Sequence, residues 1–198
     1  MKKIVASLLI MPLMASIPAS AQQFGLKMGQ TVSQIKTSGI KLTKENGSTW
    51  SATYLPYGNK MFDDYRMLVM PRSGLCRINA YISQVPDTKY GDRTKDKYES
   101  IKDSLDEKYG PGKEFNYLRS GAIWKDSDEW MWSMYKGERV LTSYWDATDN
   151  KLGKRNLKSI QLKVVGLTAD ATMISVGYEF SNIDSCVSEA KASNGSNL

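Results

Sequence analysis

The sequence predicts an α+β fold in which antiparallel sheet packs against two helices. Residues 76–83 and 172–180 alternate apolar and polar side chains, the period of a half-buried strand. Residues 92–109 instead place apolar side chains at the spacing of one helix face. Helix patterns are followed by runs of strand patterns, an order typical of antiparallel sheets with helices packed on them.

The first half is expected to contain a short strand over residues 24–29 that ends in a turn, then a short helix and three further strands. Thr31 and Gln34 have the spacing of a capping box, so a helix begins there, and Ser38-Gly39 ends it. Three strands are expected after it, over residues 49–54, 65–70 and 76–83. The alternation of the last strand places Cys76 on its core side.

The second half is expected to contain a longer helix and four strands. Asp92 is the expected N-cap, and Gly110-Pro111 ends the helix. The apolar stripe of this helix consists of Tyr98, Ile101, Leu105 and Tyr109. The four strands are expected over residues 130–135, 139–145, 160–164 and 172–180.

The repeated order divides the chain into units. Residues 22–86 form the first expected α+β unit and residues 87–192 the second, and the two form either a tandem duplication or one continuous domain. Identity between the halves is faint, so duplication is a hypothesis. The tail, residues 193–198, is small and polar and is expected to be disordered.

Residues 1–21 have the features of a cleavable signal peptide. Lys2 and Lys3 precede an apolar stretch, and Ala19-Ser20-Ala21 gives the small-residue pattern at which a signal peptidase cleaves. The apolar stretch is shorter than the roughly 20 residues of a membrane anchor. Cleavage near Ala21-Gln22 predicts a periplasmic or secreted protein; the alternative is a buried N-terminal strand or helix.

Cys76 and Cys186 are the two cysteines of the chain. An oxidising compartment favours a disulfide between them. That bond closes a loop of about 110 residues, which stabilises by about 4–5 kcal/mol in the chain-entropy model. Two free buried thiols or a redox pair are the alternatives, although redox pairs usually lie close together in sequence.

Composition excludes several classes of function. The chain has no His, which excludes Ser-His-Asp and Cys-His mechanisms and His-ligated zinc. Phosphate-loop and dinucleotide motifs are also missing, so no cofactor and no metal are expected. The net charge of +6 comes from interspersed signs. This favours weak attraction to anionic surfaces such as lipopolysaccharide or phospholipid, and no nucleic-acid binding.

Carboxylate chemistry is the remaining catalytic option. Asp126, Asp128 and Glu129 lie among tryptophans, and Asp146 and Asp149 follow Trp145. A glycosidase needs two carboxylates across a sugar site, often with aromatic platforms. The alternative interpretation is that these acids are solvated turn formers. No residue is assigned as catalytic.

Aromatic density is the main positive feature of the sequence. Trp and Tyr are favoured anchors at interfaces because they bury large areas while keeping a polar group. The candidate partner-binding residues are Trp124, Trp130, Trp132, Tyr135, Tyr144 and Trp145. Ordinary sheet core is the competing interpretation, because aromatic residues are also good strand formers.

Two short motifs resemble small periplasmic α+β modules. The opening Phe24-Gly25-Leu26-Lys27-Met28-Gly29-Gln30-Thr31 resembles that of the outer-membrane assembly lipoprotein BamE and of the β-lactamase-inhibitor-protein fold. The helix end Lys108-Tyr109-Gly110-Pro111 is similar to helix ends of such modules. Similar openings occur in uncharacterised exported proteins of bacteria and prophages. The lipidated Cys of the BamE family is missing here.

These observations predict a binding protein of the cell envelope rather than an enzyme. The expected partner is another envelope protein, which this chain inhibits or assists. The alternatives are a carboxylate-dependent enzyme acting on glycan and an envelope factor encoded by a mobile element.

Overall fold

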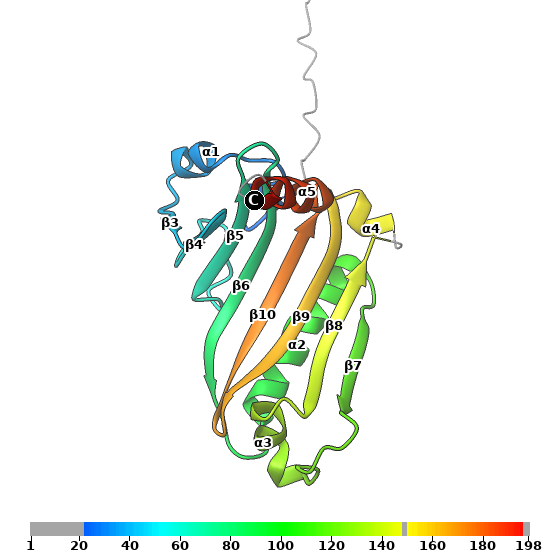
Figure 1. Ribbon diagram of the computed structural model, residues 1–198. Coiled ribbons are helices and arrows are strands. Elements are labelled where there is room, and N and C mark those ends of the chain that lie inside the picture. The colour runs from blue at the N-terminus through cyan, green and yellow to red at the C-terminus, as the bar shows by residue number, and fades with distance from the viewer. Residues whose placement is uncertain (1–21, 148–149, 196–198) are drawn as a thin grey trace, which may run out of the picture.

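The structure is a computed structural model that describes residues 22–147 and 150–195. Over these residues the α+β fold predicted from the sequence is confirmed, as an eight-stranded antiparallel sheet, a small two-stranded sheet and five helices (Figure 1). The helices are α1 (Val32–Thr37), α2 (Asp92–Tyr109), α3 (Trp130–Tyr135), α4 (Asn150–Gly153) and α5 (Ile183–Gly195).

The large sheet has the strand order β3-β4-β5-β6-β10-β9-β8-β7. Its strands are β3 (Thr43–Lys44), β4 (Thr49–Ala52), β5 (Asp64–Met70), β6 (Gly74–Pro86), β7 (Lys113–Leu118), β8 (Arg139–Asp146), β9 (Leu157–Thr168) and β10 (Ala171–Phe180). The small sheet pairs β1 (Gln22–Gln23) with β2 (Leu26–Lys27).

One helix followed by four antiparallel strands occurs twice along the chain. The strands β3 to β6 follow α1, and β7 to β10 follow α2. The last strand of each set lies at the middle of the sheet, where Ala80 of β6 pairs with Val176 of β10. A single sheet therefore runs through both sets of strands.

The main core lies between one face of this sheet and α2. Tyr98, Ile101 and Leu105 of α2 are buried against inward-facing residues of β10 such as Ile174 and Val176. In Figure 1, α2 lies behind the sheet while α5 crosses the upper end of its front. The front of the sheet, away from α2, is called the open face below.

The segment 130–135 is a helix, so the strand predicted there is wrong. Trp130, Met131 and Met134 are buried in the main core, at the spacing of one helix face. In a segment of only six residues, this spacing is easily mistaken for the alternation of apolar and polar side chains in a strand. Asp126 and Glu129 form a capping box that starts the single 3₁₀ turn Ser127–Glu129 leading into α3.

Several elements were not predicted from the sequence, among them the edge strands β3 and β7 and the helix α5. The edge strands β3 and β7 are short and largely exposed, so they carry little apolar alternation. The helix α5 has small and polar residues over most of its length. It extends to Gly195, so the predicted disorder is wrong for residues 193–195; residues 196–198 lie outside the described residues.

A register shift in β6 changes the expected environment of Cys76. Leu68 pairs with Arg77 and Val69 with Leu75, which leaves Cys76 without a partner in β5. Leu75 therefore enters the main core, whereas Cys76 is buried in a second cluster beneath α5. Placing Cys76 on the core side by simple alternation was wrong, because a bulge exchanges the two faces.

The predicted signal peptide, residues 1–21, lies outside the described residues. Within the ranges that the structure describes, no helix is long and apolar enough to cross a membrane.

Candidate functional site

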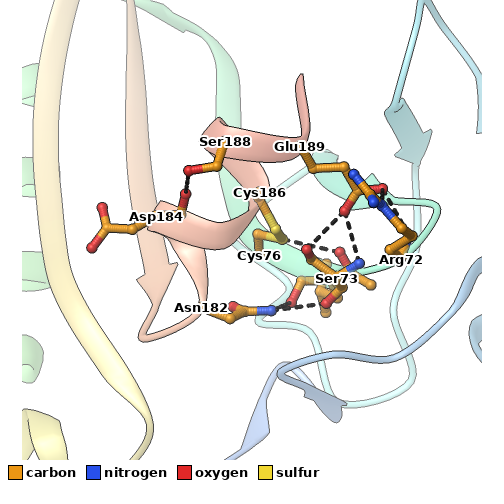
Figure 2. The surroundings of a disulfide bond; sticks show 10 residues. Arg72, Ser73, Cys76, Asn182, Asp184, Cys186, Ser188 and Glu189 are labelled. Atoms are coloured by element: carbon orange, nitrogen blue, oxygen red, sulfur yellow. Dashed lines mark hydrogen bonds and ion pairs between the residues drawn. A yellow bond between two sulfur atoms is a disulfide. The ribbon is translucent and has the colours of Figure 1, made fainter. Parts of the chain in front are cut away.

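A disulfide joins the open face of the sheet to α5. Cys76 of β6 and Cys186 of α5 are bonded across a Cα–Cα distance of 6.5 Å, as predicted (Figure 2). Met70 and Ile183 complete the buried cluster around the bond. A disulfide of this kind is compatible with a location outside the cytoplasm.

Glu189 of α5 binds the turn between β5 and β6. Its carboxylate accepts hydrogen bonds from the backbone N–H of Arg72 at 2.8 Å, and from the N–H and hydroxyl of Ser73 at 2.9 and 2.7 Å (Figure 2). Burial alone would raise the pKa of this carboxyl. The hydrogen bonds from Ser73 and Arg72 outweigh it and hold the pKa below its ordinary value.

Two of the six candidate partner-binding aromatics belong to the core. Trp130 is 6% exposed and Trp145 is 3% exposed, so neither presents a surface to a partner. The indole Nε1–H of Trp145 donates to Asp106 Oδ1 at 3.0 Å and to the Gly110 carbonyl at 2.9 Å. The binding role expected for Trp130 and Trp145 is therefore wrong: one anchors α3, and the other anchors the end of α2.

Three of the remaining aromatics lie in ring contact and are called the aromatic cluster below: Trp132 and Tyr135, which are exposed, and Trp124, which is half-buried. The rings of Trp124 and Trp132 stack with centroids 5.3 Å apart, and Tyr135 lies edge-on to Trp132 at 5.9 Å. Lys136 Nζ lies 5.5 Å from the Trp132 ring and 4.8 Å from the Tyr135 ring. Beside the cluster, Ile123 is 71% exposed.

Two glutamates hold the backbone of this region in place. Glu138 Oε2 accepts the N–H of Ile123 at 2.8 Å and of Trp124 at 3.0 Å. Glu129 Oε2 accepts the N–H of Lys125 at 2.9 Å and of Asp126 at 3.1 Å. The loop that carries Trp124 is thus bonded through its backbone to two acidic side chains, whereas Trp132 and Tyr135 are carried by α3.

Three of the five carboxylates considered for glycan chemistry have structural roles. Asp126 and Glu129 form the capping box before α3. Asp128 accepts a hydrogen bond from Lys89 Nζ at 2.8 Å, which lowers the pKa of the Asp128 carboxyl. Asp146 is exposed at the end of β8, and Asp149 lies outside the described residues.

In the described part of the chain, no group of His, Cys, Asp or Glu could hold a metal ion. The acidic side chains near α3 already accept hydrogen bonds from backbone amides and from Lys89. They therefore offer no ligand set.

Tyr144, the sixth candidate, lies apart from the aromatic cluster on the open face of the sheet. Its ring meets Phe115 of β7 edge-on with centroids 5.8 Å apart, and its hydroxyl accepts a hydrogen bond from Gln161 Nε2 at 2.6 Å. Both rings line a groove of about 510 Å³ that runs along β7, β8 and β9. This volume lies within the range of small-molecule sites.

Sequence reasoning missed this groove and its three cations, Arg119, Arg139 and Lys163. They come from different strands or strand ends and approach one another only through the pairing of β7 with β8 and of β8 with β9. No motif in the sequence groups them.

Comparisons of the chain with protein-family models, with curated proteins and with solved structures give no match. The resemblance to periplasmic α+β modules therefore stays a resemblance of two short motifs.

Proposed function

We propose that this chain is a periplasmic or secreted binding protein that captures another envelope protein through the aromatic cluster. One observation carries the proposal: Trp132 and Tyr135 are 38% and 42% exposed and make ring contacts, although the same six-residue helix buries Trp130. A helix of this protein therefore has one aromatic face in the core and another at the surface.

The chemistry of the aromatic cluster favours a protein partner. Trp and Tyr dominate the small number of residues that account for most binding energy at protein interfaces. The backbone hydrogen bonds that Glu138 and Glu129 accept pre-organise the loop that carries Trp124, which reduces the entropy lost on binding.

Charge defines the partner surface further. Lys136 lies over the rings of the cluster, and in the described chain neither Lys125 nor Lys136 forms an ion pair. A complementary surface would offer an apolar pocket for Trp132 with carboxylates at its rim.

The test is capture of a partner from envelope extract by the oxidised protein, quantified by mass spectrometry. We expect Trp132→Ala and Trp124→Ala to reduce recovery of the same protein by about tenfold or more, the loss of one interface anchor. Glu138→Gln should give a smaller loss, because it loosens the loop without removing a ring.

Tyr54→Ala is the matched control, since Tyr54 is also a strongly exposed aromatic but lies outside the cluster. It should leave recovery unchanged. Equal recovery with wild-type protein and with the Trp132 and Trp124 variants, all of them folded by circular dichroism, would remove the cluster as the binding surface.

A further inference from the structure

The groove on the open face is a second candidate binding site, separate from the aromatic cluster. We propose that it is a binding site for an anionic amphiphile, a molecule with a phosphate or carboxylate head and an apolar body. The cations at its walls and the aromatic rings beside them define these two parts of the ligand.

Three cations line the groove without any acidic neighbour among the lining residues. In the described chain, Arg119, Arg139 and Lys163 form no ion pair, whereas Arg66 and Arg77 on the same sheet are paired with Asp64 and Glu179. The sheet therefore neutralises its other arginines but leaves these three charges available. Unpaired cations gathered in one concave site are suited to an anion.

Among the residues that the structure describes, the guanidinium groups of Arg119 and Arg139 each donate one hydrogen bond, from Nε. Arg119 donates to the Gly137 carbonyl and Arg139 to Ser133 Oγ, both at 3.0 Å. A guanidinium has five N–H donors, so the Nη atoms of both residues stay available, in side chains that are already positioned. This arrangement suits bidentate binding of phosphate or carboxylate oxygens.

Burial strengthens the contribution of Arg139. Its side chain lies between β8 and α3, and desolvation lowers the pKa of its guanidinium from the ordinary value. A partly buried cation attracts an anion more strongly than an exposed one, because less water screens the interaction.

The apolar part of the groove consists of rings and branched side chains. Phe115 and Tyr144 contact each other edge-on at its wall, and Val140 and Val165 also line it. A free inorganic ion would leave these surfaces wet. An amphiphile covers them and gains from burial of its apolar body.

The test is isothermal titration calorimetry of the purified, oxidised protein with dodecyl phosphate and with dodecanoate. We expect saturable binding of both, and binding of dodecyl maltoside, which has the same chain and a neutral head, at least about tenfold weaker. Inorganic phosphate alone should also bind at least about tenfold more weakly than dodecyl phosphate. Comparable affinity for the neutral amphiphile, or for inorganic phosphate, would overturn the proposal.

Variants locate the site. Lys163→Gln and Arg119→Gln change exposed side chains and should each weaken dodecyl phosphate binding by about tenfold, and Arg139→Gln by more. Arg93→Gln removes an exposed arginine of α2 that lies outside the groove and forms no ion pair with any residue the structure describes, and this variant should bind like wild type. If Lys163→Gln and Arg119→Gln, with unchanged circular dichroism, also bind like wild type, the groove is not the site.

Discussion

Single side chains decide which aromatics serve the core and which remain at the surface. Trp145 and Trp132 lie in the same short stretch of sequence, yet among the described residues only the indole of Trp145 has a hydrogen-bonded side-chain partner, the half-buried carboxylate of Asp106. Asp106 also accepts from Lys102 Nζ at 2.9 Å and from the Gly112 N–H at 2.7 Å. Burial would raise the pKa of this carboxyl, but the bonds from Lys102, Gly112 and Trp145 hold it below the ordinary value.

Replacing Trp145 should therefore destabilise the folded protein more than replacing Trp132. We expect Trp145→Ala to lower the free energy of unfolding by about 3–5 kcal/mol, the usual effect of truncating a large buried side chain. Trp132→Ala should change it by about 1 kcal/mol or less, because the ring is partly exposed. Denaturant unfolding followed by circular dichroism measures both, and equal effects would contradict the assignment of Trp132 to the surface.

Glu189 predicts a pH-dependent attachment of α5. Because its pKa is lower in the folded protein than the ordinary 4.5, its contribution to stability is fully present above about pH 4.5 and is lost as the pH falls through the folded pKa. Glu189→Gln removes this dependence. As the pH is lowered, the rate of amide hydrogen exchange in α5, corrected for the intrinsic pH dependence of exchange, should rise more steeply in the wild type than in the variant. Parallel pH profiles would show that the carboxylate does not hold the turn at Arg72-Ser73.

At the scale of elements, close backbone contact positions α3 on the sheet. A Cβ on Gly166 of β9 would lie 2.5 Å from the carbonyl carbon and 2.6 Å from the carbonyl oxygen of Met134. Gly166→Ala should force α3 away from the sheet and lower the free energy of unfolding by about 1–3 kcal/mol. Gly153→Ala, where a Cβ meets nothing within 4 Å, is the control. A variant at Gly166 as stable as wild type would contradict the close packing of α3.

The attachment of α5 depends on few contacts. Its small apolar cluster holds Ile183 and Cys186, and the disulfide is the covalent link to β6. Reduction should sharply increase hydrogen exchange in α5 while β10 and β6 at the sheet centre remain protected. The loss of stability should not exceed about 4–5 kcal/mol, the chain-entropy value for such a loop. Unchanged exchange in α5 after complete reduction would mean that the disulfide does not hold the helix.

Long, periodic elements could be predicted from the sequence, and short or irregular ones could not. The stripe of α2 and the alternation of β10 repeat often enough to define a period, so both were expected correctly. The six residues of α3 cover fewer than two turns and fit either period. The bulge at Cys76 exchanges the core-facing and outward-facing positions within one strand, and no feature of the local sequence predicts it.

At the scale of the whole molecule, the sheet divides two environments. One face packs on α2 and forms the main core; the other bears α5 at one end and the groove along β7, β8 and β9. The aromatic cluster lies at α3, near the groove, since Met134 and Gly137 line the groove and Tyr135 belongs to the cluster. The disulfide and the cluster could be anticipated from residue types, whereas the groove exists only through strand pairing.

Binding of an envelope protein by the aromatic cluster can be tested by site-specific photo-crosslinking in cells. The crosslinker p-benzoylphenylalanine replaces Ile123, which is exposed and directly precedes Trp124 in the chain. We expect one discrete crosslinked adduct at this position, its loss in combination with Trp132→Ala, and none when the probe replaces Tyr54. The same adducts at both positions, or an adduct at Ile123 that persists with Trp132→Ala, would contradict binding by the aromatic cluster.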